Sequence, residues 1–358
     1  VSVALMLKRL LPLALLLAAF PAQAQTVEGA IDGDAILKNF TFRSGEKLPE
    51  LKMHYTTLGK PQRDASGAIV NAVMILHGTG GTGKQFLQPQ FAGELFGPGQ
   101  PLDTAKYYVI LPDNIGHGGS SKPSDGMRMA FPRYDYDDMV AAQHRLLTEK
   151  LGIGELQLIL GTSMGCMHAF VWGESWPGFA KRLAPFACLP VEIAGENRMW
   201  RTLIIDAIKA DPAWNGGNYT QEPAAGLRTA TSIGLIAGSN PYALQAQYPT
   251  RSAAEAYKDT AFARSYGRND ANDVIYQFDA SRTYNPWADL EKIDVPLLWV
   301  NSADDFINPP GYGIAEQAVA RMPKARYVLI PASPETKGHG THSWAKFWKD
   351  DLAKLMAE

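Results

Sequence analysis

Short apolar runs of strand length alternate along the chain with segments whose apolar residues recur every three or four positions. Two early runs, at 35–42 and 51–59, mix apolar and polar residues and predict a hairpin. Six later runs are almost wholly apolar, as in strands covered on both faces, and they lie at 72–78, 107–113, 156–162, 183–190, 295–301 and 327–331. Strands that alternate with helices predict an α/β fold with a mostly parallel, doubly wound sheet.

Helical periodicity fills several of the segments between these runs. The predicted helices lie at 137–152, 311–323 and 341–356. Residues 191–285 contain no convincing strand, only helical segments and loops, and therefore predict a helical lid inserted between two strands of the sheet. The predicted domains are a first core part at 35–190, the lid at 191–285 and a second core part at 286–358.

One short segment joins a strand, a sharp turn and a helix around a serine. Residues 158–170 read LILGTSMGCMHAF, so Ser163 lies between Gly161 and Gly165 where a strand-like run meets a helical one. This order is typical of a nucleophile elbow, in which the glycines avoid collisions with the neighbouring strand or helix. The elbow presents its serine at a helix N-terminus, where developing negative charge is favoured. An ordinary glycine turn is the alternative.

A catalytic serine needs a base, a group that orients the base, and donors for the oxyanion. In elbow enzymes the acid and then the base follow the serine along the chain. The strand at 295–301 leads into Asp304 and Asp305, of which we prefer Asp305 as the orienting acid. His339 lies between glycines just before the last predicted helix, and we prefer it to His342 as the base.

A glycine-rich loop directly follows the strand at 72–78 and reads GTGGTGKQF. Elbow enzymes take one oxyanion donor from a loop in this place and the other from the residue after the nucleophile. We therefore expect the backbone N–H groups of Thr79 and Met164 to bind the oxyanion. A phosphate-binding loop is the rival interpretation, but that motif requires Ser or Thr after its lysine, and Gln85 stands there.

The first 24 residues have the pattern of an export signal. Lys8 and Arg9 precede an apolar run that is too short to span a membrane, and Ala22-Gln23-Ala24 suits a signal peptidase. We expect cleavage after Ala24 and a periplasmic or secreted protein without a stable membrane span. A retained membrane anchor is the alternative.

Composition limits the partners of the chain. Its 34 Lys and Arg residues against 36 Asp and Glu leave a formal charge of −2, so the chain lacks the excess of positive charge that binds a nucleic acid.

Both cysteines, Cys166 and Cys188, lie in apolar surroundings, and we expect buried thiols rather than a disulfide, although export permits one. The spacing of Cys and His residues indicates no metal site, and we expect no cofactor.

With these residues identified, the sequence resembles the homoserine O-acetyltransferase family of the α/β-hydrolase superfamily. The similarity is colinear from about Tyr55 to Trp348, and its most specific segments include GPGQPLDT and DPAWNGG. The resemblance implies an eight-stranded α/β-hydrolase sheet with a helical lid and suggests a homodimer. It places the catalytic triad on Ser163, Asp305 and His339.

Two positions depart from the family pattern that suits homoserine. Gly340 stands where an aspartate typically follows the catalytic histidine, and Ile205 stands where the lid commonly carries an arginine. A site without these partners leaves both charges of an amino acid unpaired, which is costly. Homoserine is therefore not the expected substrate.

Three functions are compatible with this sequence. The first is an exported serine hydrolase that cleaves a small-molecule carboxylic ester through an acyl-enzyme, since an exported acyl-enzyme meets water more often than acetyl-CoA. The second is an O-acyltransferase that moves an acyl group from CoA to an alcohol. The third is a non-catalytic binding protein on the same fold.

Overall fold

A single eight-stranded sheet organises the part of the chain that the structure describes. The computed structural model describes residues 29–358, so the predicted leader at 1–24 lies outside the described residues. The strands are β1 (Ile31–Thr41), β2 (Lys47–Leu58), β3 (Ala72–Leu76), β4 (Tyr108–Pro112), β5 (Leu158–Thr162), β6 (Leu183–Phe186), β7 (Leu297–Ser302) and β8 (Ala325–Ile330). Each overlaps one of the eight runs predicted from the sequence.

The strand order explains where a site can form. The strands follow the order β1-β2-β4-β3-β5-β6-β7-β8, with β1, β2 and β4 paired antiparallel and every other pair parallel. The chain leaves β3 toward β4 on one side and later returns to β5 on the other side. Such a switch point opens a crevice at the carboxyl ends of the strands. Leu76 of β3 pairs with Gly161 of β5, so the segments after both strands emerge side by side.

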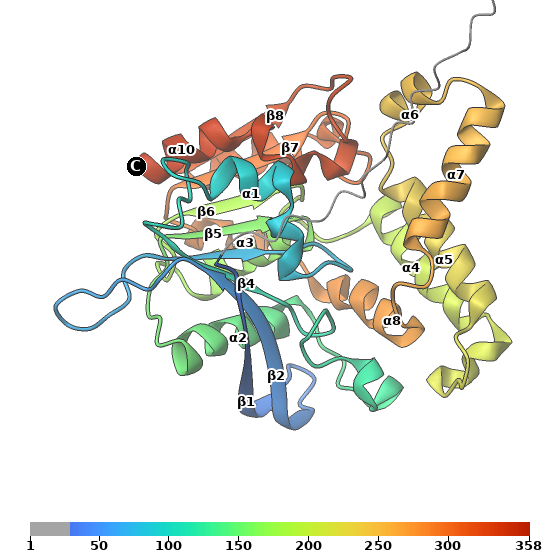
Figure 1. The fold of residues 1–358 in the computed structure, drawn as a ribbon, viewed down its shortest axis with the longest axis horizontal. Coiled ribbons are helices and arrows are strands. Elements are labelled where there is room, and N and C mark those ends of the chain that lie inside the picture. The colour runs from blue at the N-terminus through green and yellow to red at the C-terminus, as the bar shows by residue number, and fades with distance from the viewer. Residues whose placement is uncertain (1–28) are drawn as a thin grey trace, which may run out of the picture.

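Helices cover both faces of the sheet, which explains why the central strands are apolar throughout (Figure 1). Met74 and Leu76 of β3 belong to the core that packs under α2 (Tyr136–Arg145) and α3 (Met164–Ser175). Val73 and Ile75 belong to the opposite core, under α1 (Pro89–Leu95) and α10 (Lys349–Ala357). Helix α9 (Ile314–Arg321) leads into β8, and β8 lies at the sheet edge beside β7.

All three predicted helices are shorter than expected. The segment 311–323 forms a 3-10 turn at Pro310–Tyr312 and then α9. The segment 137–152 forms α2 and then a π-helical turn at Leu146–Lys150. The helix predicted at 341–356 begins only at Lys349, after 3-10 turns at Gly338–Ser343 and Ala345–Phe347. Packing is the reason, because Trp348 is buried against Phe186 and its indole N–H donates to the His342 carbonyl.

Between β6 and β7 the chain forms only helices and loops. These helices are α4 (Gly195–Lys209), α5 (Ala224–Ala237), α6 (Pro241–Gln247), α7 (Arg251–Ser265) and α8 (Ala271–Asp279). They stand together to one side of the sheet (Figure 1) and share a small core that includes Ile204, Ile208 and Leu227. Among residues 29–358, no helix is long and apolar enough to cross a membrane.

Candidate active site

Ser163 occupies a strained turn between β5 and α3. Its φ of 54° and ψ of −111° lie where a residue with a side chain is rarely found, at a cost of about 1–3 kcal/mol. The flanking glycines permit the turn, because a Cβ at Gly161 would collide with the Gly165 carbonyl and a Cβ at Gly165 with the Leu76 carbonyl. The Ser163 N–H donates to the Phe186 carbonyl at 2.8 Å, which fixes the turn against β6. The strand–turn–helix predicted from the sequence is confirmed.

The three residues proposed as a triad meet at this turn. Nε2 of His339 lies 2.8 Å from Oγ of Ser163, and Nδ1 of His339 lies 2.8 Å from Oδ2 of Asp305. Asp305 follows β7, and His339 lies in the 3-10 turn after β8. Both segments leave the carboxyl edge of the sheet beside the elbow. Asp305 and His339 therefore join one chain of hydrogen bonds with Ser163, although they follow it in the sequence by 142 and 176 positions.

Asp305 is held as a carboxylate. Burial raises its pKa, but the neighbouring His339 and donors from Asn308 and Ile307 outweigh burial, so that the pKa is lowered overall. Asn308 Nδ2 donates to Oδ2 at 2.9 Å, and the Ile307 N–H donates to Oδ1 at 2.8 Å. A charged, buried carboxylate fixes the imidazole with Nδ1–H toward Asp305 and Nε2 free to accept from Ser163.

Asp304, the alternative acid, contacts the loop around His339 but not the imidazole itself. Its Oδ2 accepts from the Thr336 hydroxyl at 2.7 Å and from the Gly338 N–H at 3.2 Å, both in the loop that carries His339. Asn240, at the start of α6, donates to the same oxygen. Asp304 therefore fastens the histidine loop and ties the helical insertion to it, a role that the sequence analysis missed.

The glycine-rich loop after β3 lies against the nucleophile. A Cβ placed on Gly78 would stand 3.7 Å from Ser163 Oγ, so the backbone entering Thr79 passes close to the hydroxyl. Within residues 29–358, neither the Thr79 N–H nor the Met164 N–H donates to a protein acceptor. His77 holds this loop, because its Nδ1 bonds the Gly78 carbonyl at 2.8 Å and its Nε2 accepts the Asn114 N–H at 3.0 Å. Burial lowers the pKa of His77 to about 4, which keeps it neutral.

His342, the alternative base, packs edge-on against His339 with ring centroids 5.3 Å apart, and no hydrogen bond within residues 29–358 joins its side chain to Ser163 or Asp305. Its Nδ1 bonds the Ser343 hydroxyl at 3.1 Å. Burial and the neighbouring His339 lower the pKa of His342 to about 3, so it stays neutral at physiological pH. The structure therefore places His339, and not His342, on the serine.

A cavity of about 330 Å³ opens beside Ser163 and His339. Its apolar lining comes from α3, the start of the helical insertion and the loop after β7, and includes Met167, Ile193, Ile307 and Ile314. The start of the helical insertion thus forms part of the cavity wall. The volume and apolar lining of the cavity suit a small to medium acyl or alcohol group.

The cavity also contains a cation that the sequence analysis did not expect. Arg201 lies one helical turn before Ile205 on α4, is 3% exposed, and lines the cavity. The expectation that this site lacks a positive partner is wrong, because Arg201 lines the cavity although Ile205 stands at the family's arginine position. Gly340 supplies no side chain, as expected.

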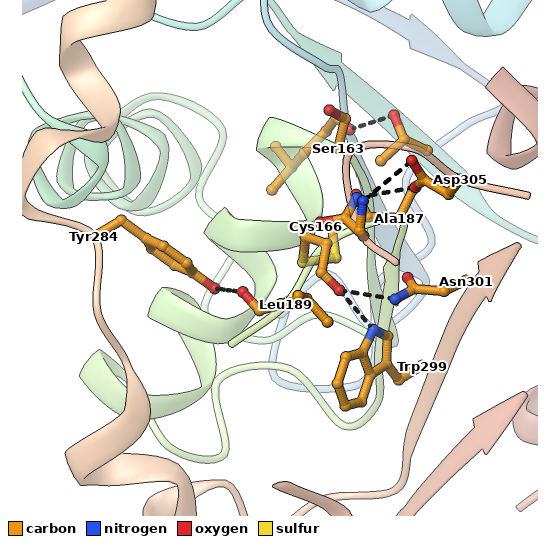
Figure 2. Close-up of a disulfide and its surroundings, with 12 residues drawn as sticks. Ser163, Cys166, Ala187, Leu189, Tyr284, Trp299, Asn301 and Asp305 are labelled. Atoms are coloured by element: carbon orange, nitrogen blue, oxygen red, sulfur yellow. Dashed lines mark hydrogen bonds between the residues drawn. A yellow bond between two sulfur atoms is a disulfide. The ribbon is translucent and has the colours of Figure 1, made fainter. Parts of the chain in front are cut away.

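The two cysteines form a disulfide, which corrects our expectation of free thiols. Cys166 on α3 and Cys188 after β6 have their Cα atoms 5.8 Å apart. The Cys188 carbonyl accepts hydrogen bonds from the Trp299 indole at 3.0 Å and from the Asn301 amide at 3.1 Å. Both of these side chains are labelled near the disulfide in Figure 2. The bond joins the elbow helix to the segment that lines the cavity. Strands β5 and β6 are parallel neighbours, so both cysteines emerge at the same sheet edge.

Loss of this disulfide is expected to lower the free energy of unfolding by about 3 kcal/mol, as closing a loop of this length predicts. Urea denaturation of wild type and of the Cys166→Ala, Cys188→Ala double variant measures the difference. Dithiothreitol should reproduce it in wild type and leave the double variant unaffected. A wild-type transition that does not move after thiol titration proves reduction would contradict the expectation.

Comparison with known proteins places this geometry among enzymes. Residues 71–336 match the family model described as alpha/beta hydrolase fold. The sequence is 28% identical over 325 residues to a homoserine O-acetyltransferase of Methanohalobium evestigatum, with 80% of this chain covered. The chain spans 64% of the length of that relative.

Two solved structures share nearly the whole fold. The homoserine O-acetyltransferase of Bacillus anthracis superposes with a TM-score of 0.81 at 22% identity, covering 93% of this chain and 99% of that one. An acetylester hydrolase of Corynebacterium glutamicum superposes with a TM-score of 0.78 at 21% identity, covering 92% and 96%. One architecture therefore occurs in an acyltransferase and in an esterase.

Proposed function

This chain belongs to the α/β-hydrolase family and is an enzyme of the homoserine O-acetyltransferase-like type, and from that premise we propose that it transfers an acyl group through an ester on Ser163. The hydrogen-bonded chain Ser163–His339–Asp305 at the cavity carries the proposal. A binding protein without turnover has no need of this strained and fully partnered arrangement, which argues against the third function.

The proposed reaction has two halves. His339 takes the proton of Ser163 as the hydroxyl attacks the acyl carbonyl, and it returns the proton to the leaving group. The N–H groups of Thr79 and Met164 bind the oxyanion, and Asp305 stabilises the imidazolium. In the second half His339 activates the acceptor, which attacks the acyl-enzyme and frees Ser163.

We propose an alcohol as the acceptor, because the relative from Methanohalobium evestigatum and the Bacillus anthracis neighbour are both named for O-acetyl transfer. The acyl donor is then a thioester such as acetyl-CoA. Water is the second candidate, supported by the acetylester hydrolase neighbour. The disulfide also supports it, because oxidised cysteines suit an exported protein, which acyl-CoA does not reach.

Acetyl-CoA and p-nitrophenyl acetate separate the two acceptors. Each is incubated with the enzyme alone and with a panel of hydroxyl compounds, and CoA or nitrophenol release is followed. Release that requires the alcohol, with an O-acetyl product by mass spectrometry, supports transfer. Rapid nitrophenol release in water alone, unaffected by alcohols, supports hydrolysis. Absence of turnover with every donor would overturn both.

Export remains part of the proposal. The leader pattern that ends at Ala24 supports it, and so does the disulfide. N-terminal sequencing of protein recovered from the periplasm or medium should begin after Ala24. Protein found only in the cytoplasm with residues 1–24 intact would contradict export. Light scattering of the same preparation measures the homodimer that the family resemblance suggests.

A further inference from the structure

Arg201 is a buried cation without a carboxylate. No Asp or Glu oxygen among residues 29–358 forms a salt bridge with its guanidinium, although only 3% of the residue is exposed. Nε donates to the Asn197 side chain at 2.8 Å, and Nη1 lies 3.5 Å from the Ser281 hydroxyl. Nη2 donates to no described acceptor, and the residue lines the cavity that contains Ser163 and His339.

Neutral hydroxyl groups lie beside this guanidinium. The hydroxyl oxygens of Tyr136 and Thr79 are both buried without a hydrogen-bond partner. Burial raises the pKa of the Tyr136 phenol, while the Arg201 charge and the hydroxyls of Thr79 and Ser281 act against burial, which places these groups beside the phenol. The phenol and the hydroxyls offer the guanidinium only neutral partners, and Arg201 is the member of this group that lines the cavity. Its Nη2 protons therefore remain for an acceptor-only anion.

Aromatic contacts position Arg201 but do not neutralise it. Its guanidinium carbon lies 4.7 Å from the centroid of the Trp200 ring and 6.0 Å from that of Phe278. Arg198, one turn earlier on α4, is also cationic and forms no salt bridge within the described chain. A buried, always protonated guanidinium is expected to be paired when the site is occupied.

We propose that Arg201 binds a carboxylate of the substrate at the wall of the catalytic cavity, so that the enzyme acts on acyl substrates that carry a free carboxylate besides the reacting ester. This inference rests on the proposed function and adds the substrate class. The only acidic side chain lining this cavity in the described chain, Glu192, is exposed at its rim, and Gly340 offers no carboxylate for an ammonium. A plain carboxylic acid therefore fits better than an amino acid.

The carboxylate can reside on the alcohol or on the acyl group, and two matched ester pairs distinguish these sources. The alcohol arm compares 4-acetoxybutanoate with neutral 4-acetoxybutanamide. The acyl arm compares monoethyl succinate with neutral ethyl pentanoate. Hydroxylamine is added as a common acceptor, so that release of the alcohol reports formation of the acyl-enzyme whether the natural acceptor is water or an alcohol.

Wild type is expected to show a kcat/KM at least 10-fold higher for the carboxylate member of one pair. Arg201→Gln should lower that preference by about 10- to 100-fold, mainly through KM, as loss of a charge-assisted hydrogen bond predicts. Arg201→Lys should restore part of it. Arg228→Gln on α5 is the matched control, because this guanidinium also packs on an aromatic ring, that of Phe262 at 4.7 Å, but does not line the cavity. This variant should keep the wild-type preference.

A measurement on wild type guards against variants that do not fold. Butanoate should inhibit turnover of 4-acetoxybutanamide at concentrations at which butanamide has no effect. Equal kcat/KM values within both pairs, or equal inhibition by butanoate and butanamide, would overturn the inference while neutral-ester turnover still supports the proposed function. If no ester is turned over and Ser163 takes no label, the proposed function itself fails.

Discussion

Replacement of Ser163 by alanine is expected to lower turnover of the acyl donor by about 10⁴- to 10⁶-fold. The serine oxygen is the atom that forms the acyl-enzyme, and its only described side-chain hydrogen bond is to Nε2 of His339. Residual rate comes from the oxyanion donors and the cavity, which the substitution leaves in place. The fold should be retained, since alanine keeps the backbone angles and removes one oxygen.

A fluorophosphonate probe gives the second measurement. Tryptic mass spectrometry should find the probe on Ser163 of wild type and on no residue of Ser163→Ala. Ser343→Ala is the matched control, because Ser343 also bonds a histidine, His342, in the same 3-10 turn. That variant should label like wild type. Labelling of another serine, or near wild-type turnover by Ser163→Ala, would refute the proposed nucleophile.

The sequence predicts the framework of this site because the framework depends on local patterns. Apolar runs identify the buried strands, and paired glycines identify a turn that side chains would obstruct. The order of serine, acid and histidine then follows from strands that end at one edge of a parallel sheet. These signals act over a few residues, or through topology that the runs themselves define, and they lead to Ser163, Asp305 and His339.

Features that depend on distant packing were not predictable in this way. The disulfide requires knowledge that β5 and β6 are neighbours, which brings Cys166 and Cys188 together from positions 22 residues apart. Arg201 has the same sequence context as any arginine on an amphipathic helix, and only the tertiary structure shows that its charge is buried and unpaired. The late start of α10 depends on the burial of Trp348.

Of the two adjacent acids after β7, Asp305 is the one whose substitution is expected to have the second large effect on activity. Asp305→Asn is expected to lower kcat by about 10⁴-fold, because an amide can donate to the imidazole and favour the tautomer that cannot accept the serine proton. Asp304→Asn is the contrasting variant, since its carboxylate accepts from Thr336, Gly338 and Asn240 but does not reach His339.

Because an amide in place of Asp304 leaves buried donors unpaired, we expect that variant to lose about 1–3 kcal/mol of stability. Its kcat should fall far less than that of Asp305→Asn, since the Asp305–His339 bond remains. Steady-state kinetics and urea denaturation of both variants separate the two effects. If Asp304→Asn lost activity as severely as Asp305→Asn while remaining folded, the 2.8 Å contact between Asp305 and His339 would not be the bond that orients the base.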